Sequence, residues 1–295
     1  MHRILIALVF LITACKKDPS VTGSDAKKAM GLYAKGFNGL LADPKRMLQS
    51  YFSSVPPDGV PDPKNPPHLM PDSFAASKIK EAKDAFAEAK EARPDAMASL
   101  DAPAQAAVDA IEKATAAIDQ VGKYYQAETY KDDKGAKAKE LHAQLVAADK
   151  AFGDAMHQLG DGLSKIEDQQ AADELAKYAD DKDYSYWYRY YDQQAKKFLT
   201  VVEAGDKTKL APAKQALDAA TAELQAFVGK KGGKLHSSFK TYADRADAFV
   251  AEATKLMRDG DLDKAYDPLV SAYNQLIGMG NTLAEIEGVN ALKDQ

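Results

Sequence analysis

The sequence predicts an all-α protein, an elongated antiparallel bundle of six to seven long helices with coiled-coil-like packing. Apolar residues recur at alternating steps of four and three, which is typical of helices that cross at about 20° with interlocked side chains. Alanine, lysine and acidic residues dominate while β-branched residues are sparse, a composition that favours helices. Turn signals built from glycine, aspartate and proline interrupt the pattern often. A folded bundle is therefore expected in place of one continuous coiled coil.

The chain begins with a pattern that predicts a secretory signal peptide over residues 1–14. Arg3 supplies a positive head, Ile4–Leu11 is an unbroken apolar run, and Ala14 is a small residue before the expected cut. The apolar run is far shorter than the roughly 20 residues that a membrane-spanning helix needs. We therefore expect a cleaved leader and not a transmembrane anchor.

Cys15 follows this leader directly and resembles the cysteine of a bacterial lipobox, which receives a diacylglyceryl group before the leader is cut. It is the only cysteine in the chain, so no intramolecular disulfide can use it. The alternative is an ordinary signal peptide that happens to precede a cysteine. Residues 15–24 are then a lipidated tether. Lys16 does not resemble an inner-membrane retention signal, so the periplasmic leaflet of the outer membrane is the expected location, with the inner membrane or cell surface as alternatives.

Composition excludes some classes of partner. The net charge of −5 is spread along the chain, which gives no electrostatic footprint for nucleic acid. The length of 295 residues suits one large domain or two small ones. We expect a single helical-bundle domain over residues 25–290, held by packing and not by disulfides.

The first helices are expected before residue 54. Ser24 or Asp25 is expected to cap a helix that runs to about Ala42. Asp43, as a cap, and Pro44, in the first turn, are expected to restart the helix, which continues to about residue 53.

A proline-rich insert follows at residues 54–71. It holds more than half of the 13 prolines of the chain, and neither a helix nor a central strand can carry them. An extended, polyproline-like connector is expected. A partner-docking segment with an apolar tip at residues 68–70 is the alternative.

The later helices follow from the apolar spacing between turn signals. They are expected at 72–93, 101–125, 136–166, 184–204, 208–228, 235–258 and 262–283. The pattern leaves open whether 136–204 is one helix or breaks near residues 180–183. Gly205 and Gly260 are expected to end helices, and Pro268 to kink the last helix or to start its regular part.

The segment from Leu32 to Ser53 carries a family resemblance. Its features are an aromatic at Tyr33, the Phe37-Asn38 pair and an aromatic pair at Tyr51-Phe52, with a related Tyr-Asn-Gln-Leu element at residues 273–276. In these features the chain is similar to the YiiG-like bacterial lipoprotein family, whose domain has no known function. The resemblance implies a helical envelope lipoprotein over about residues 25–288, and no site. Independently of it, Asn38 and Asn274 are expected to cap or bridge neighbouring helices, with a ligand-binding amide as the alternative.

No catalytic or metal-binding motif stands out. The histidines of the mature chain are His68, His142, His157 and His236, and none has a two-histidine chelating spacing. Carboxylates alternate with lysines at helix-surface spacing, which indicates solvated ion pairs. We expect no cofactor, no metal and no enzymatic activity.

One stretch is unusually rich in aromatic residues and holds the only tryptophan. The candidate binding residues are Tyr184, Tyr186, Trp187, Tyr188, Arg189, Tyr190 and Tyr191. A helix would turn some of these rings inward and the others elsewhere, so aromatics would cover most of its circumference. A thick aromatic core is one interpretation. A recognition patch for a glycan, peptide or lipid headgroup, with Arg189 adding charge, is the other.

The sequence therefore predicts a lipid-anchored periplasmic envelope protein with a non-enzymatic, partner-binding or structural role. It would attach to the membrane through Cys15 and could hold an envelope protein partner. The alternative is a periplasmic binding module for a small ligand, glycan or metal at residues 184–191.

Overall fold

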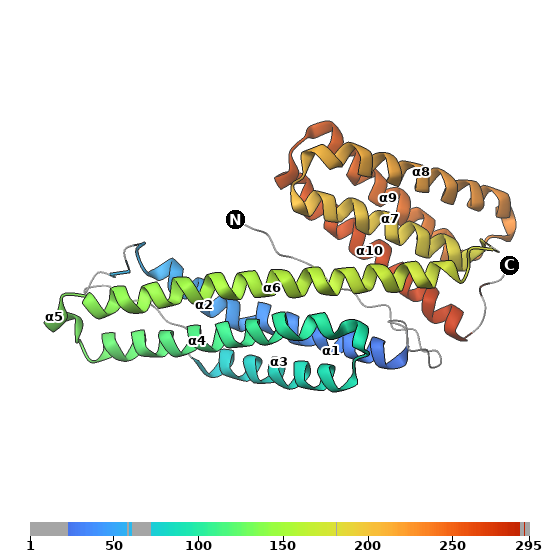
Figure 1. Ribbon diagram of the computed structural model, residues 1–295. Helices are drawn as coiled ribbons and strands as arrows, with labels where there is room; N and C mark the ends of the chain where they lie inside the picture. Colours follow the sequence, from blue (N-terminus) through green and yellow to red (C-terminus); the bar gives the residue numbers. More distant parts are fainter. Residues whose placement is uncertain (1–22, 58, 61–71, 181, 290–291, 293–295) are drawn as a thin grey trace. The chain divides into compact units, whose positions relative to one another are not determined.

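The computed structural model describes residues 23–57, 59–60, 72–180, 182–289 and 292. Every regular element within these residues is a helix, which confirms the predicted all-α class (Figure 1). The α-helices are α1 (Ser24–Leu41), α2 (Asp43–Ser54), α3 (Asp72–Ala92), α4 (Asp101–Gln126), α5 (Tyr130–Asp133), α6 (Ala136–Ala176), α7 (Tyr184–Ala204), α8 (Lys207–Lys231), α9 (Ser237–Asp259) and α10 (Leu262–Val289). Two 3-10 helices, η1 (Asp95–Leu100) and η2 (Gly232–Lys234), complete the described elements. None of the described helices is both long and apolar enough to cross a bilayer.

The chain divides into two compact units, where the sequence predicts one domain over residues 25–290. The N-terminal unit covers residues 16–167, and the C-terminal unit holds the described residues from 168 onward. The division falls inside α6, so this long helix contributes its last turns to the C-terminal unit. The described residues form ten α-helices, more than the six or seven long helices expected, and two of them, α2 and α5, are short.

The N-terminal unit is built on the apolar positions that the helical spacing predicts. Its buried side chains include Met30, Tyr33, Phe37, Leu40, Tyr51, Ile111, Ile118, Leu145 and Leu159. Gly36 of α1 faces α3, where a Cβ atom would come within 2.3 Å of the Phe86 ring. A glycine at this point therefore lets α1 and α3 pack closely.

Helix ends follow the predicted residues in part. Gly205 and Gly260 have φ angles of +65° and +67° and end α7 and α9, which confirms both predicted stops. The predicted caps of α1 and α2 are wrong, because Gly23 and Ala42 hold those positions and no side chain bonds there. At α2, Pro44 lies in the first turn, as expected, and removes one of the N–H groups that a cap would satisfy.

Residues 136–204 form two helices and not one, an alternative that the apolar spacing leaves open. α6 ends at Ala176 and α7 begins at Tyr184. Lys182 adopts a left-handed backbone, with φ of +43°, and the Asp183 side chain accepts a hydrogen bond from the Ser185 amide. The same segment thus ends one helix and caps the next. At the other end of the chain, α10 begins at Leu262 and contains Pro268 within its span.

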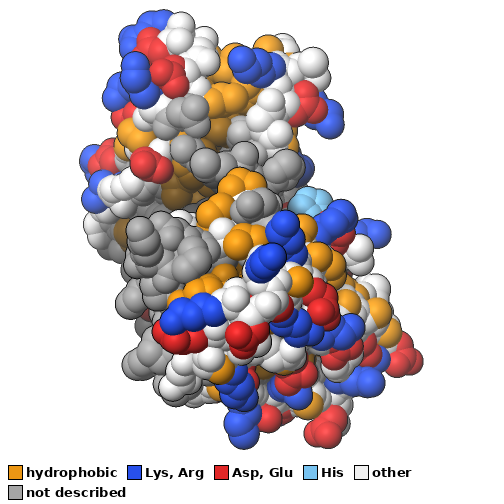
Figure 2. Space-filling model, turned by 90° about the vertical axis from the view of Figure 1, so that its left-hand side faces the viewer, with side chains coloured by type: hydrophobic (Ala, Val, Ile, Leu, Met, Phe, Trp, Pro, Cys, Tyr) orange, Lys and Arg blue, Asp and Glu red, His pale blue; other side chains and the backbone are white. Residues whose placement is uncertain are grey.

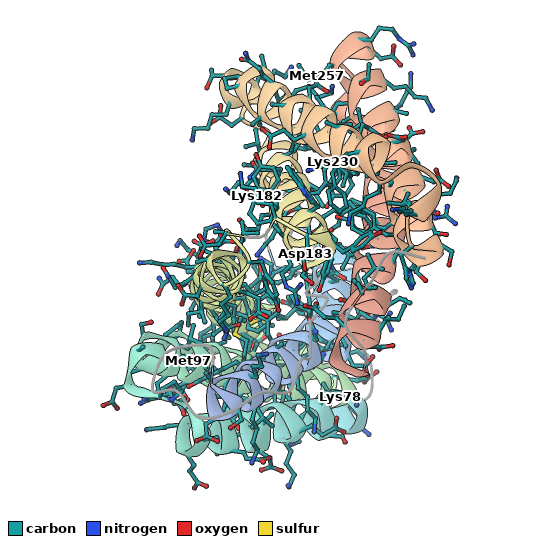
Figure 3. The ribbon with its side chains drawn as sticks, turned by 90° about the vertical axis from the view of Figure 1, so that its right-hand side faces the viewer. Lys78, Met97, Lys182, Asp183, Lys230 and Met257 are labelled. Atoms are coloured by element: carbon teal, nitrogen blue, oxygen red, sulfur yellow. The ribbon has the colours of Figure 1, made fainter. Side chains whose placement is uncertain are left out.

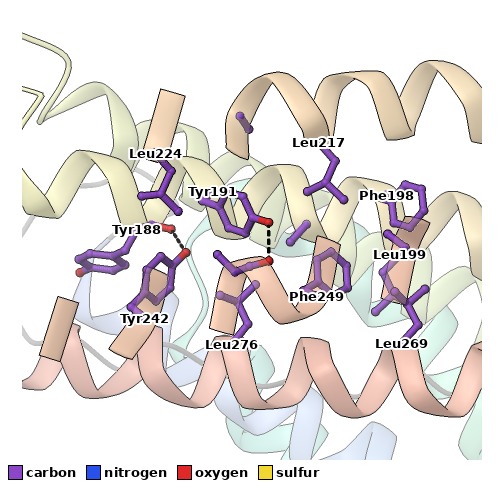
Figure 4. Close-up of a cluster of buried hydrophobic side chains, with 14 of the residues drawn as sticks. Tyr188, Tyr191, Phe198, Leu199, Leu217, Leu224, Tyr242, Phe249, Leu269 and Leu276 are labelled. Atoms are coloured by element: carbon purple, nitrogen blue, oxygen red, sulfur yellow. Dashed lines mark hydrogen bonds between the residues drawn. The ribbon is translucent and has the colours of Figure 1, made fainter. Parts of the chain in front are cut away.

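The C-terminal unit packs α7, α8, α9 and α10 around one apolar core, shown in Figure 4. Its fully buried members are Tyr188, Tyr191, Phe198, Leu217, Leu224, Phe239, Tyr242, Phe249, Leu269, Leu276 and Leu283. They come from all four helices at helical spacing. The unit thus has a core of its own, and the predicted aromatic stretch opens its first helix.

The solvent-facing surface carries interspersed charge. Figure 2 shows lysine and arginine side chains beside aspartate and glutamate. Pairs three or four residues apart form ion pairs, among them Lys80–Asp84, Lys123–Asp119, Lys150–Asp154 and Lys240–Asp244. These exposed pairs each contribute about 0.3–0.5 kcal/mol at most. They support solubility more than stability, as the sequence pattern indicates.

The proline-rich insert lies largely outside the described residues. Its first residues are described: Val55 is buried, and the Gly59 amide donates to the Pro56 carbonyl at 2.9 Å. Gly59 has φ of +77°, and a Cβ there would meet His142 at 2.5 Å. A glycine is therefore required at position 59, beside His142.

Candidate functional site

The aromatic stretch 184–191 forms the first two turns of α7 and divides into two sets. Tyr184, Tyr188 and Tyr191 are buried in the core of the C-terminal unit. Tyr186, Trp187 and Tyr190 are half-buried; Trp187 and Tyr190 pack against that core, and Tyr186 packs against these two rings. The core interpretation is therefore right for the first set, and only the second set is accessible to a ligand.

The recognition-patch hypothesis expects the Arg189 side chain to extend into solvent, but it does not. Its side chain is only 9% exposed, and Nη1 lies 2.9 Å from Glu287 Oε2 on α10. The same guanidinium donates to the Ser185 carbonyl at 3.0 Å and lies over the rings of Tyr178 and Tyr188. Arg189 is thus the centre of a buried ion pair that joins α7 to α10.

Glu287 is held by two further donors from α7. The hydroxyls of Ser185 and Tyr188 donate to its two carboxylate oxygens at 2.7 Å and 2.8 Å. Although burial alone would raise the pKa of Glu287, the Ser185 hydrogen bond and the Arg189 charge hold it below its ordinary value. The carboxylate is therefore charged at neutral pH, which matches its arginine partner.

Asp192 is a second buried carboxyl, about one turn after Arg189 on α7. The single hydroxyl proton of Tyr242 on α9 is shared between Asp192 Oδ1 at 2.7 Å and the Tyr188 carbonyl at 2.8 Å; the contact with Tyr188 is drawn in Figure 4. Its Oδ2 faces Gly280 of α10, where a Cβ would come within 2.6 Å. Burial raises the pKa of Asp192 to about 8, against the opposing effects of the Tyr242 hydrogen bond and the Arg189 charge. This carboxyl is therefore mainly protonated at neutral pH.

The half-buried rings form a contiguous aromatic ledge, defined here as Tyr186, Trp187 and Tyr190 with Phe227 of α8. The rings of Tyr186 and Tyr190 are stacked with centroids 5.7 Å apart, and Trp187 packs against Phe227 at 5.8 Å. Trp187 Nε1 donates to the Lys182 carbonyl at 2.9 Å. Each ring contacts another ring, and Tyr186, Trp187 and Tyr190 keep part of their surface open to solvent.

Tyr184 connects this stretch to the turn between α8 and α9. Its hydroxyl donates to the Lys234 carbonyl at 3.4 Å and accepts from the His236 amide at 3.2 Å. The Lys231 ammonium lies 4.9 Å from the centre of the Tyr184 ring. Tyr184 therefore fixes the position of a lysine-bearing turn.

Replacing Tyr184 with phenylalanine should lower the free energy of unfolding of the C-terminal unit by about 1–2 kcal/mol, because two backbone groups of the turn lose their partner. Urea unfolding followed by Trp187 fluorescence measures this. Tyr186→Phe is the matched control and should change stability by less than about 0.5 kcal/mol. Equal stability of Tyr184→Phe and wild type would show that the hydroxyl does not hold the turn.

The described histidines have structural partners. His142 Nδ1 lies 3.0 Å from the Tyr51 hydroxyl, His157 pairs with Asp161, and His236 Nδ1 accepts from the Ser238 amide at the start of α9. No group of three or more metal-ligating side chains occurs in the part of the chain that the structure describes. His68 lies outside that part.

Other predicted positions lie away from the aromatic stretch. Asn38 and Asn274 are both exposed, on α1 and α10, and not at buried helix contacts. Cys15 lies outside the described residues. A cavity of about 300 Å³ between α9 and α10, which the sequence reasoning missed, is lined by Arg245, Ala248, Glu252, Pro268, Ser271, Ala272 and Gln275. None of these belongs to the aromatic stretch.

Comparison with known proteins identifies a family and no activity. Neither the curated proteins nor the solved structures that were searched gave a match to this chain. A family model described as "Protein of unknown function (DUF3829)" matches residues 26–268, which is most of both helical units. The chain belongs to this family.

Proposed function

We propose that this chain is a lipid-anchored protein of the bacterial envelope with a non-enzymatic role, either binding a partner protein or supporting envelope structure. The observation that carries the proposal is the N-terminal pattern, in which an apolar run ends in Ala14 and the only cysteine follows at once. Acylated at Cys15, the chain would hang from the periplasmic leaflet of the outer membrane. The resemblance of Leu32–Ser53 to the YiiG-like lipoprotein family supports this proposal.

The energetics of anchoring support a permanent attachment. Each buried acyl CH₂ contributes about 0.8 kcal/mol, and one myristoyl chain alone binds only marginally. A bacterial lipoprotein carries several acyl chains, so its release from the membrane is negligible. The helical units then need no membrane-spanning segment of their own. We further propose that their helices pack in the antiparallel, coiled-coil-like manner that the apolar spacing predicts.

The aromatic ledge favours a second candidate function, a binding module for a small ligand or glycan. Three of the seven predicted residues, Tyr186, Trp187 and Tyr190, are half-buried and accessible. The other four are committed to the core or to the Arg189–Glu287 pair. A ligand would therefore contact a smaller surface than the full stretch offers.

Replacing Cys15 with serine should move the protein from the membrane fraction to the soluble fraction or leave it with an uncut leader, because the serine hydroxyl does not accept the diacylglyceryl group. Fractionation of a bacterial host that expresses the full chain measures this, with Ser20→Ala in the tether as the control. Membrane retention of a cleaved Cys15→Ser protein that persists at high salt, which weakens contacts between lysines and lipid headgroups, would contradict lipid anchoring.

A further inference from the structure

The end of the C-terminal unit that carries the aromatic ledge also gathers lysines. Residues 224–243 contain four lysines and no aspartate or glutamate, in a chain whose net charge is −5. Lys230 and Lys234 are exposed on the turn between α8 and α9, and Lys231 is half-buried beside them. Lys182, before α7, is exposed at the same end, as Figure 3 shows for Lys182 and Lys230.

Aromatic residues contact three of these lysines, Lys182, Lys231 and Lys234. The Lys182 ammonium lies 5.3 Å from the Tyr186 ring centre, and the Lys231 ammonium lies 5.5 Å from that of Phe227. The Tyr184 hydroxyl bonds the backbone of Lys234. The three half-buried rings of the ledge and the lysines thus form one surface, which we call the lysine–aromatic end. It consists of Lys182, Tyr186, Trp187, Tyr190, Lys230, Lys231 and Lys234.

Three acidic groups at this end have other partners, while burial and, to a lesser extent, the nearby Glu223 of α8 raise the pKa of the Tyr190 hydroxyl. The Asp183 carboxylate caps α7, Glu287 pairs with Arg189, and Asp244 pairs with Lys240. The positive charge of Lys230 and Lys234 therefore stays open to an anion from outside. Tyrosine and tryptophan edges beside lysine ammonium groups are the combination that proteins place at the headgroup level of a bilayer.

We propose that the lysine–aromatic end binds the phosphate headgroups of an anionic lipid surface. This inference rests on the proposed function, because a lipid anchor at Cys15 would hold the chain next to such a surface. A lipid surface fits better than a neutral glycan, because the exposed ammonium groups of Lys230 and Lys234 attract phosphate groups and an uncharged sugar offers them no counter-charge. The contact would add electrostatic attraction of about 1 kcal/mol per lysine near an anionic membrane.

The test uses the mature chain from Lys16, which keeps both helical units and has neither leader nor anchor. Trp187 is the only tryptophan, so its emission reports directly on the ledge. We expect a blue shift and co-sedimentation with vesicles that contain phosphatidylglycerol, both weakened by salt, and neither with phosphatidylcholine alone. Binding to a soluble anionic polysaccharide with no binding to the vesicles would overturn the proposal in favour of a glycan site.

The triple variant Lys230→Gln/Lys231→Gln/Lys234→Gln should bind these vesicles about 100-fold more weakly. The double variant Lys230→Gln/Lys234→Gln keeps Lys231 and its contact with the Phe227 ring, so it controls for a folding defect in the triple variant. It should bind about 30-fold more weakly than wild type. Lys197→Gln/Lys207→Gln/Lys209→Gln removes the same charge from exposed positions toward the other end of α7 and α8 and should bind like wild type. Equal losses in both triple variants would contradict a local surface.

The vesicle experiment can fail independently of the experiment that tests anchoring at Cys15. Vesicle binding is measured without residue 15, whereas acylation is measured on the full chain. An acylated chain whose helical units ignore anionic vesicles would overturn this inference alone.

Discussion

Replacing Arg189 with methionine should destabilise the C-terminal unit by about 3–5 kcal/mol. Arg189 lies 2.9 Å from Glu287, and both side chains are largely excluded from solvent. Methionine fills most of the space but leaves the Glu287 carboxylate buried without its positive partner. Urea unfolding followed by Trp187 fluorescence measures the change, since this tryptophan lies in the same unit.

Two further variants separate the effect of the lost Arg189 charge on stability from the effect of the lost packing. Arg258→Met, at an exposed arginine beside Asp259, should change stability by less than about 0.5 kcal/mol. Adding Glu287→Gln to Arg189→Met should recover much of the loss, because the amide carries no charge and its oxygen still accepts a hydrogen bond from α7. If the double variant is as unstable as the single variant, the loss comes from packing and the account of a buried charge is wrong.

Replacing Asp192 with asparagine should stabilise the C-terminal unit at pH 8 and flatten its pH dependence. Burial raises the folded-state pKa of Asp192 from 3.8 to about 8. Between these values the folded state keeps a proton that the unfolded state releases, so the contribution of Asp192 is most favourable below about pH 4 and declines as the pH rises toward 8. The total decline is on the order of a few kcal/mol. Asparagine can still accept the hydrogen bond from Tyr242 and has no proton to lose.

The measurement is the free energy of unfolding from pH 5 to pH 8 for wild type and Asp192→Asn. The difference between them should grow with pH in favour of the variant. Asp247→Asn, at an exposed carboxylate that accepts from Gln225, should follow the wild-type curve. A constant difference across the range would show that Asp192 does not titrate with a raised pKa in the folded state.

Helix positions were predictable where local spacing decides them. The steps of four and three place Phe198, Leu217, Tyr242 and Phe249 on buried faces, and all four are buried. Gly205 and Gly260 end helices because they adopt positive φ without steric cost.

Long-range polar contacts were not predictable in the same way. Ser185 and Glu287 lie 102 residues apart in the chain, so local spacing cannot show that they meet. The local sequence therefore predicts that Arg189 is a surface charge in a recognition patch. In the structure, Glu287 of α10 pairs with Arg189, and the arginine is buried. The signal that could have found this pair is the apolar surroundings of Arg189 on its own helix.

The division of the aromatic stretch was only half predictable. Helical spacing turns Tyr184, Tyr188 and Tyr191 inward, as expected, but it does not say how far Tyr186, Trp187 and Tyr190 are covered. Phe227 on α8 packs against Trp187, and the spacing along the chain carries no information on that contact.

Mass spectrometry of the N-terminal peptide of the full chain, purified from a bacterial host, tests the central claim most directly. We expect a peptide that begins at Cys15 and carries a diacylglyceryl group on its sulfur and an acyl chain on its amine. A mature protein whose Cys15 is unmodified, or whose leader is still attached, would contradict lipid anchoring and with it the proposed place in the envelope.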